Sequence, residues 1–256
     1  MAGAAITFDF HNTLAQADEW FEIEVNGLVS SFLRWRSLDR GVTIDPETLW
    51  SADVAYRQLR HGIREHGNEL KAEACVATIL DELNIPFQED EVERGVRALM
   101  VPALASTMPL PGAIETVRAL KRAGVSLGVI SSAVHHPFLI WTLDRFGIGG
   151  EFDVITTSAS AGFYKSRPEI YWSALTALGA DPKTSVHIGD SHQYDVDGAR
   201  KAGMRTVLVS LSELDQDIVP RPDLTLSTLV GSAPIILELF ARSAWVQPPN
   251  VLGSAK

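Results

Sequence analysis

The chain is poor in cysteine and has no long apolar run. Its 256 residues include a single cysteine, Cys75, which excludes a disulfide framework and any zinc site built from several cysteines. No stretch approaches the roughly 18 uncharged apolar residues of a membrane-spanning helix. The N-terminus also lacks the charged segment followed by an apolar one that marks a signal peptide. We therefore expect a cytoplasmic protein without a membrane partner.

Basic residues are also in deficit. Lys and Arg number 22 against 32 Asp and Glu, which gives a net charge of −10 at pH 7. A field of this sign repels nucleic acid and anionic lipid, so neither is an expected partner. It also repels a phosphorylated small molecule unless a metal ion or local basic groups offset it. Apolar residues, by contrast, make up 46% of the chain, enough for a sizeable core.

Two patterns of apolar residues divide the chain. Between residues 17 and 105, apolar side chains recur at helical spacing in four stripes. Between residues 106 and 243, short apolar runs alternate with helical segments, which is typical of βαβ units and a parallel sheet. The predicted strands are Ile6–Phe10, Val125–Ile130, Phe152–Thr156, Ser185–Ile188 and Thr206–Val209. The predicted helices that separate the later strands lie near Ala113–Ala123, Pro137–Phe146, Pro168–Leu178 and Asp195–Ala202.

The spacing of the strands predicts two domains. Roughly 110 residues separate the first strand from the second, far more than a loop contains, so the helical segment is expected to be an insert. Right-handed crossovers then place helices on both faces of the sheet. The predicted fold class is α/β, a doubly wound parallel-sheet core with an inserted all-helical domain. We assign residues 1–16 and 106–243 to the core, 17–105 to the helical domain and 244–256 to a loose tail.

Chemically useful side chains follow the predicted strands. In an open parallel sheet, ligands bind beyond the carboxyl ends of the strands. Asp9, Ser131, Lys165 and Asp190 are expected at that edge, with Asp195 following Asp190 in the sequence. Carboxylates are the oxygen ligands that Mg²⁺ prefers, and a hydroxyl and an ammonium group suit the oxygens of a bound phosphate. Asp9 also has the chemistry of a carboxylate nucleophile.

The order and placement of these segments resemble the haloacid dehalogenase (HAD) superfamily, in the branch that carries a helical cap after its first motif. The four matching segments are Phe8–Leu14, Ile130–Ser132, Gly162–Pro168 and Ile188–Ala199. The resemblance implies a Rossmann-like core and a hydrolase that cleaves a small phosphorylated metabolite with Mg²⁺. Asp9 would attack phosphorus and form an aspartyl-phosphate.

The resemblance also implies roles for particular residues. Ser131 and Lys165 would hold the phosphate, with Ser132 beside them. Asp9, the main-chain carbonyl of His11 and Asp190 would hold Mg²⁺. Asp195 would support the metal through water or by pairing with Lys165.

His11 departs from the motif of the family's phosphatases, which carry a second aspartate two residues after the nucleophile as the general acid/base. We expect His11 to take over that role. Two alternatives remain open. One is metal-independent hydrolysis of a carbon–halogen bond by Asp9, against which the retained Asp190 and Asp195 argue. The other is a non-catalytic protein that binds a phosphorylated ligand or a partner.

A basic stripe stands out in the acidic helical segment. Arg57, Arg60, His61 and Arg64 are spaced i, i+3, i+4, i+7, and on a helix these positions share one face. The stripe is either a solvated surface, with Asp53 and Arg57 as an i,i+4 pair, or an anion-facing cap surface. In the second case Arg60 would bind the substrate.

Overall fold

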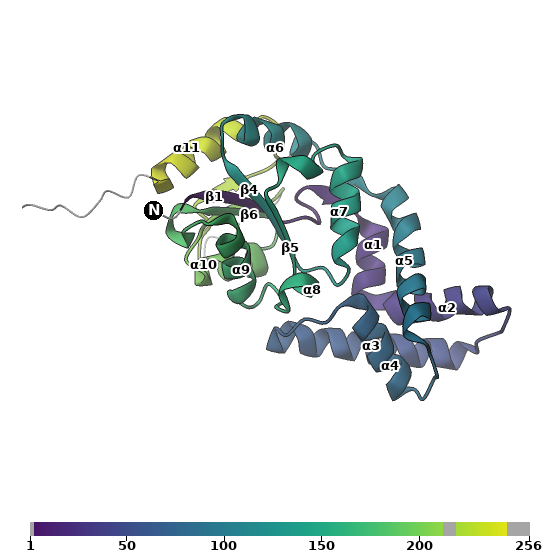
Figure 1. The fold of residues 1–256 in the computed structure, drawn as a ribbon. Coiled ribbons are helices and arrows are strands. Elements are labelled where there is room, and N and C mark those ends of the chain that lie inside the picture. Colours follow the sequence, from purple (N-terminus) through teal and green to yellow (C-terminus); the bar gives the residue numbers. More distant parts are fainter. Residues whose placement is uncertain (1–2, 212–218, 245–256) are drawn as a thin grey trace, which may run out of the picture.

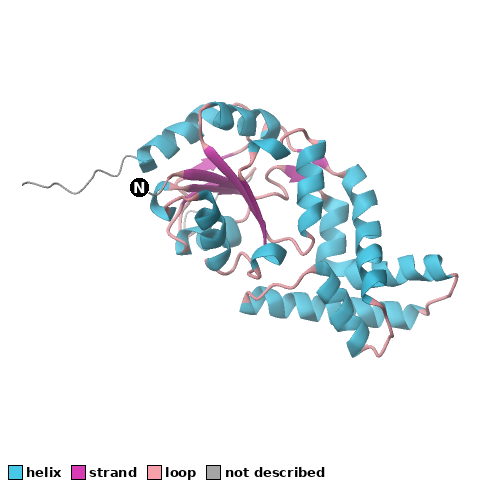
Figure 2. Ribbon diagram, in the orientation of Figure 1, coloured by secondary structure: helices cyan, strands magenta, loops and turns pink. Residues whose placement is uncertain are grey.

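The structure, a computed structural model, describes residues 3–211 and 219–244. Its centre is a six-stranded sheet in the order β5-β4-β1-β6-β7-β8 (Figures 1 and 2). All five strand pairs are parallel. The strands are β1 (Ala5–Phe8), β4 (Ser126–Ser131), β5 (Val154–Thr157), β6 (Val186–Gly189), β7 (Arg205–Val209) and β8 (Leu224–Leu226). Strand β1 is fully buried between two neighbours, which explains its apolar sequence.

Helices cover both faces of this sheet. Figure 1 shows α6 and α11 on one face and α9 and α10 on the other. The longer helices are α6 (Ala113–Arg122), α7 (His136–Arg145), α9 (Glu169–Leu178) and α11 (Ala233–Ala244). Shorter helical segments are α8 (Ser158–Ala161), α10 (Ala199–Lys201) and 3₁₀ turns at Gly149–Glu151 and Pro182–Thr184. The layered arrangement confirms the predicted α/β class.

Two predicted boundaries are corrected by the structure. Strand β1 ends at Phe8 rather than Phe10, because the Phe10 carbonyl accepts the N–H groups of Leu14 and Ala15 in a turn. The helix predicted at Asp195–Ala202 is a π-helix at His192–Gly198 that continues into α10.

The end of the chain also differs from the prediction. Strand β8 and helix α11 were not predicted. Most of the expected tail, residues 245–256, lies outside the described residues.

The helical segment begins and ends on a small two-stranded sheet. Strands β2 (Ala15–Gln16) and β3 (Met108–Pro109) pair antiparallel, so the chain leaves the core and returns to it at one place. Between them lie α1 (Asp18–Glu22), a π-helix at Ile23–Gly27, α2 (Leu28–Arg40), α3 (Pro46–His66), α4 (Ala72–Glu82) and α5 (Glu89–Ser106). None of the described helices combines the length and apolarity needed to cross a membrane.

Local sequence explains the limits of α3. Asp45 caps its first turn by accepting the N–H of Thr48, and Pro46 follows at the first helical position. Gly67 ends the helix with a φ of 76°, a left-handed conformation that glycine adopts without strain. Tyr56 packs from α3 into the shared apolar core of the helical segment, which also buries the free thiol of Cys75.

Candidate active site

Two carboxylates stand side by side at the carboxyl edge of the sheet. Strand β1 pairs with β6 in parallel, with Phe8 opposite Ile188. The residues that follow each strand therefore emerge together. Asp9 is anchored there by its N–H, which donates to the Ile188 carbonyl at 2.8 Å, and Asp190 follows the end of β6. Carboxylate oxygens of Asp9, Asp190 and Asp195 lie within 4.8 Å of one another.

Lys165 bridges this group of carboxylates. Its side chain is 2% exposed, and its ammonium group donates to Asp9 and to Asp195 Oδ1, the latter at 2.6 Å. The loop that carries Lys165 is held from the sheet edge, because the Lys165 N–H donates to the Ser132 hydroxyl at 3.3 Å. Lys165 therefore connects its own loop to the segments that follow strands β1 and β6.

Both oxygens of Asp195 are engaged by the protein. Besides Lys165, Oδ1 lies 3.0 Å from His187 Nε2, and Oδ2 accepts the Ser191 N–H at 2.9 Å. Gly189 makes this approach possible, since a Cβ there would lie 2.2 Å from the Asp195 carboxyl carbon. Of the two supporting roles considered for Asp195, the geometry shows the pairing with Lys165.

Sequence analysis missed two residues that support the carboxylates. His187 lies in β6, fully buried, between Asp195 and the Thr7 hydroxyl, which is 2.8 Å from its Nδ1. A histidine inside an otherwise apolar strand was the available signal. The Asn12 side chain hydrogen bonds to Asp190 and lowers its pKa. Asn12 has a φ of 60°, and the tight turn after β1 was its signal.

The charges explain how each group titrates. Burial raises the pKa of Asp9 to about 7, with the Lys165 charge opposing and the Asp195 and Asp190 charges adding to the increase. Burial and the Asp195 charge likewise raise the pKa of Asp190 to about 6, against the Lys165 charge. For Asp195, burial favours the neutral acid, but Lys165 and His187 outweigh it and lower its pKa. Burial alone would lower the pKa of Lys165, yet Asp195 and Asp9 raise it.

The His11 side chain lies against helix α1, where it contacts the rings of Trp20 and Phe21. Its ring stacks on Phe21, with centroids 4.3 Å apart and planes at 8°. Its Nε2 is 3.6 Å from Asp18 Oδ1, too far for a hydrogen bond. Burial lowers the pKa of His11, and the interaction with Asp18 only partly opposes this. The imidazole is therefore held between the sheet edge and α1.

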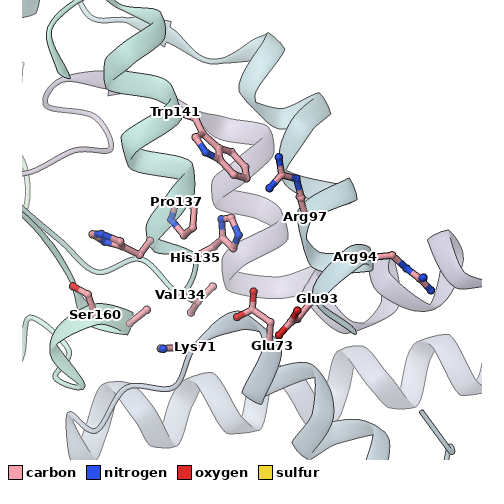
Figure 3. Close-up of a pocket in the computed structure, with 12 residues that line it drawn as sticks. Lys71, Glu73, Glu93, Arg94, Arg97, Val134, His135, Pro137, Trp141 and Ser160 are labelled. Atoms are coloured by element: carbon pink, nitrogen blue, oxygen red, sulfur yellow. The ribbon is translucent and has the colours of Figure 1, made fainter. Parts of the chain in front are cut away.

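One cavity of about 220 Å³ brings the predicted residues together. It is lined by the predicted residues Asp9, His11, Ser131, Ser132, Lys165, Asp190 and Asp195, together with Asn12, Trp20, Phe21, Tyr164, Ser191 and Tyr194. The larger cleft shown in Figure 3, about 770 Å³, lies between α4 and α5 on one side and α7 and α8 on the other. It shares no lining residue with the smaller cavity.

Arg60 is the exception among the predicted site residues, and its assignment is corrected. Its side chain is 3% exposed, and its two terminal nitrogens donate to the carboxylate of Glu69 at 2.5 and 3.3 Å. Tyr56 and Ile63 share the buried face of α3 with it, whereas Arg57 and His61 are exposed. Periodicity groups residues on a helix but does not say which face is buried. Arg60 turns inward because Glu69 neutralises it there.

The fold and the cavity define an α/β hydrolase with a cluster of carboxylates and a lysine at the carboxyl edge of its parallel sheet. Comparison with known proteins agrees. The family described as haloacid dehalogenase-like hydrolases matches residues 4–203, and the chain belongs to this family. A glyceraldehyde 3-phosphate phosphatase of Pyrococcus furiosus is 26% identical over 241 residues, which cover 93% of this chain and 92% of that protein.

Solved structures share the fold at lower identity. A HAD phosphatase from Thermococcus onnurineus superposes with a TM-score of 0.61 and 20% identity, covering 91% of this chain and 97% of its own. A 2-haloacid dehalogenase from Pseudomonas syringae gives a TM-score of 0.68 at 20% identity, covering 93% and 99%. Because these likenesses extend to a phosphatase and a dehalogenase alike, they establish the fold and leave the reaction to the site.

Proposed function

We propose that this protein is a Mg²⁺-dependent phosphatase that hydrolyses a small phosphomonoester through an aspartyl-phosphate on Asp9. The observation that carries the proposal is the cluster of Asp9, Asp190 and Asp195, with Lys165 as its one counter-charge among the described cavity residues. The named relative acts on a phosphorylated metabolite, which supports the same class of substrate. Residues 17–105 would form the cap over the site, and the expected location is the cytoplasm.

The residues present fit a divalent cation. Three carboxylates against one lysine leave negative charge in a buried space. Burial is the main cause of the raised pKa values of Asp9 and Asp190, and the charges of the neighbouring acids add to it. Asp9, Asp190 and the His11 carbonyl would hold Mg²⁺. Asp195, with both oxygens engaged, would orient Lys165 instead. When bound, Mg²⁺ supplies charge that offsets the phosphate oxygens and keeps Asp9 and Asp190 ionised.

The chain's own residues divide the work of the reaction. A carboxylate oxygen of Asp9 attacks phosphorus, and the bond to the leaving oxygen breaks with its electron pair. Lys165 and the Ser131 hydroxyl bind the phosphoryl oxygens, where charge accumulates. His11 gives a proton to the leaving alcohol and then takes one from the water that hydrolyses the aspartyl-phosphate. The products are an alcohol and inorganic phosphate.

The site argues against the metal-independent alternative. Hydrolysis of a carbon–halogen bond by Asp9 has no need of Asp190, yet Asp190 is partly buried beside two further carboxylates and hydrogen bonded to Asn12. Keeping three acids together with Lys165 as the one counter-charge in the described lining is unfavourable unless a further cation binds. The retained cluster therefore favours the phosphatase over the dehalogenase. It also argues against a protein that only binds a partner, because such a protein would not need the three acids close together.

The test is hydrolysis of p-nitrophenyl phosphate and a panel of phosphorylated metabolites. We expect activity that EDTA abolishes and Mg²⁺ restores. Asp9→Asn should remove turnover because a neutral amide is a poor nucleophile. Asp197→Asn is the matched control, since Asp197 pairs with Lys201 on α10 and does not line the cavity. Activity that persists in EDTA, or in Asp9→Asn, would overturn the proposal.

A further inference from the structure

The described lining of the cavity is short of positive charge beyond the place where a phosphate would sit. Lys165 is its only Lys or Arg, and both Asp9 and Asp195 already take its hydrogen bonds. The acids that influence Asp9 most strongly are also in this cavity. A bound phosphate dianion would take up the positive charge of both Lys165 and a bound Mg²⁺. The described lining therefore offers no further Lys or Arg to pair with a second anionic group of a substrate.

Among the described residues, the cap contributes no Lys or Arg to the lining of this cavity. Arg60, the one arginine expected to face the substrate, lies over the Tyr164 ring with its guanidinium carbon 5.8 Å from the ring centroid. Its terminal nitrogens are taken by Glu69. The cap instead contributes Trp20 and Phe21 from α1, and the loop and π-helix of the core add Tyr164 and Tyr194, whose rings meet edge to face at 5.4 Å. Four aromatic side chains therefore belong to the described lining of the cavity.

Trp20, which lines the cavity, also carries one polar group, its indole N–H. The side chain is 1% exposed and is fixed by stacking on Phe138, with ring centroids 5.1 Å apart and planes at 2°, and by an edge contact with Phe10. Its indole N–H is buried and has no hydrogen-bond partner among the described residues. An indole nitrogen can only donate, and leaving a buried donor unpaired is costly. An oxygen acceptor on a bound ligand would satisfy it.

We propose that the leaving group of the substrate is a small, uncharged, oxygen-bearing alcohol, and that Trp20 selects it by donating to a hydroxyl or carbonyl oxygen. This inference rests on the proposed phosphatase function. Phosphomonoesters that carry a second phosphate or a carboxylate are disfavoured, because their extra charge would enter an acidic cavity without a partner. The cavity volume of about 220 Å³ is suited to a small alcohol.

Three esters of equal carbon number test the inference. Glycerol 3-phosphate has a neutral leaving group with hydroxyls, 3-phosphoglycerate replaces one hydroxymethyl group by a carboxylate, and n-propyl phosphate has no acceptor. We expect kcat/KM for glycerol 3-phosphate to exceed that for 3-phosphoglycerate by about 100-fold. Equal or faster hydrolysis of 3-phosphoglycerate would overturn the inference and leave the phosphatase function intact. Failure to hydrolyse any ester, p-nitrophenyl phosphate included, would overturn the proposed function itself.

Two variants test the residues. Trp20→Phe should lower the ratio of kcat/KM for glycerol 3-phosphate over n-propyl phosphate about tenfold, whereas Trp50→Phe, at a side chain 64% exposed, should leave that ratio unchanged. An unchanged ratio in folded Trp20→Phe would remove Trp20 from the proposal. Phe21→Arg, on an exposed part of α1, adds a cation beside the cavity and should raise kcat/KM for 3-phosphoglycerate about tenfold relative to glycerol 3-phosphate. No gain in that ratio would contradict the charge argument even if Trp20→Phe failed to fold.

Discussion

Glu24 gives the fold a dependence on pH that a single substitution should remove. It lies in the π-helix after α1 and is 2% exposed. Its Oε1 accepts the Val134 N–H at 3.1 Å, while Oε2 has no partner among the described residues. Burial raises the pKa of Glu24 to about 8, against the opposing charge of Arg60 and with the support of Glu69. The carboxyl is therefore protonated in the folded protein at neutral pH.

The sign and size of the effect follow from linkage. The ordinary pKa of this group is 4.5 and its folded value is about 8, so the folded state binds a proton that the unfolded state releases. The free energy of unfolding should fall as pH rises above about 4.5, and the loss should be complete above about pH 8. The difference between these two pKa values corresponds to at most about 5 kcal/mol.

Glu24→Gln should abolish this contribution. The amide is neutral at every pH and keeps an oxygen for the Val134 N–H, so the variant should match the parent near pH 5 and exceed it by a few kcal/mol at pH 9. The assay is urea unfolding at a series of pH values. Glu22→Gln is the control, since Glu22 is an exposed acceptor of the Asn26 side chain. Subtracting the pH profile of the parent's unfolding free energy from that of Glu24→Gln cancels the titration of Asp9 and Asp190, which both proteins share. Parallel profiles for parent and Glu24→Gln would refute the reasoning.

Two further predictions concern His11 and Arg60. His11→Ala should lower steady-state turnover of an alkyl phosphate about 10²–10⁴-fold. With p-nitrophenyl phosphate, whose leaving group needs little protonation, the variant should release roughly one equivalent of nitrophenolate in a burst, measured by stopped flow, before turnover stalls. Retention of kcat within about twofold on the alkyl ester would make His11 a bystander. Arg60→Ala should destabilise the fold by about 3–5 kcal/mol, because it leaves the Glu69 carboxylate buried without the arginine that neutralises it. Arg57→Ala, at an exposed position of the same helix, should change the unfolding midpoint little, and equal midpoints for the two variants would contradict the buried pair.

The sequence alone determined the order along the chain of five of the six strands of the main sheet, and the polar residues that come at or after their carboxyl ends. Asp9, Ser131, Lys165, Asp190 and Asp195 were placed at one edge because parallel strands present their carboxyl ends together. The cavity does bring these residues together. That inference needed only local patterns and one topological rule. It is therefore independent of how individual side chains pack.

Tertiary structure decided which way side chains face and what surrounds them. Helical periodicity placed Arg60 with Arg57 and His61, but only the packing of α3 against Glu69 shows that Arg60 is buried. The contact of His187 with Thr7 and the stacking of Trp20 on Phe138 also join elements that meet only in the folded chain. Burial and pairing depend on contacts between distant segments, and those contacts set the charge of the cavity. The pattern of residues within one segment does not predict these contacts.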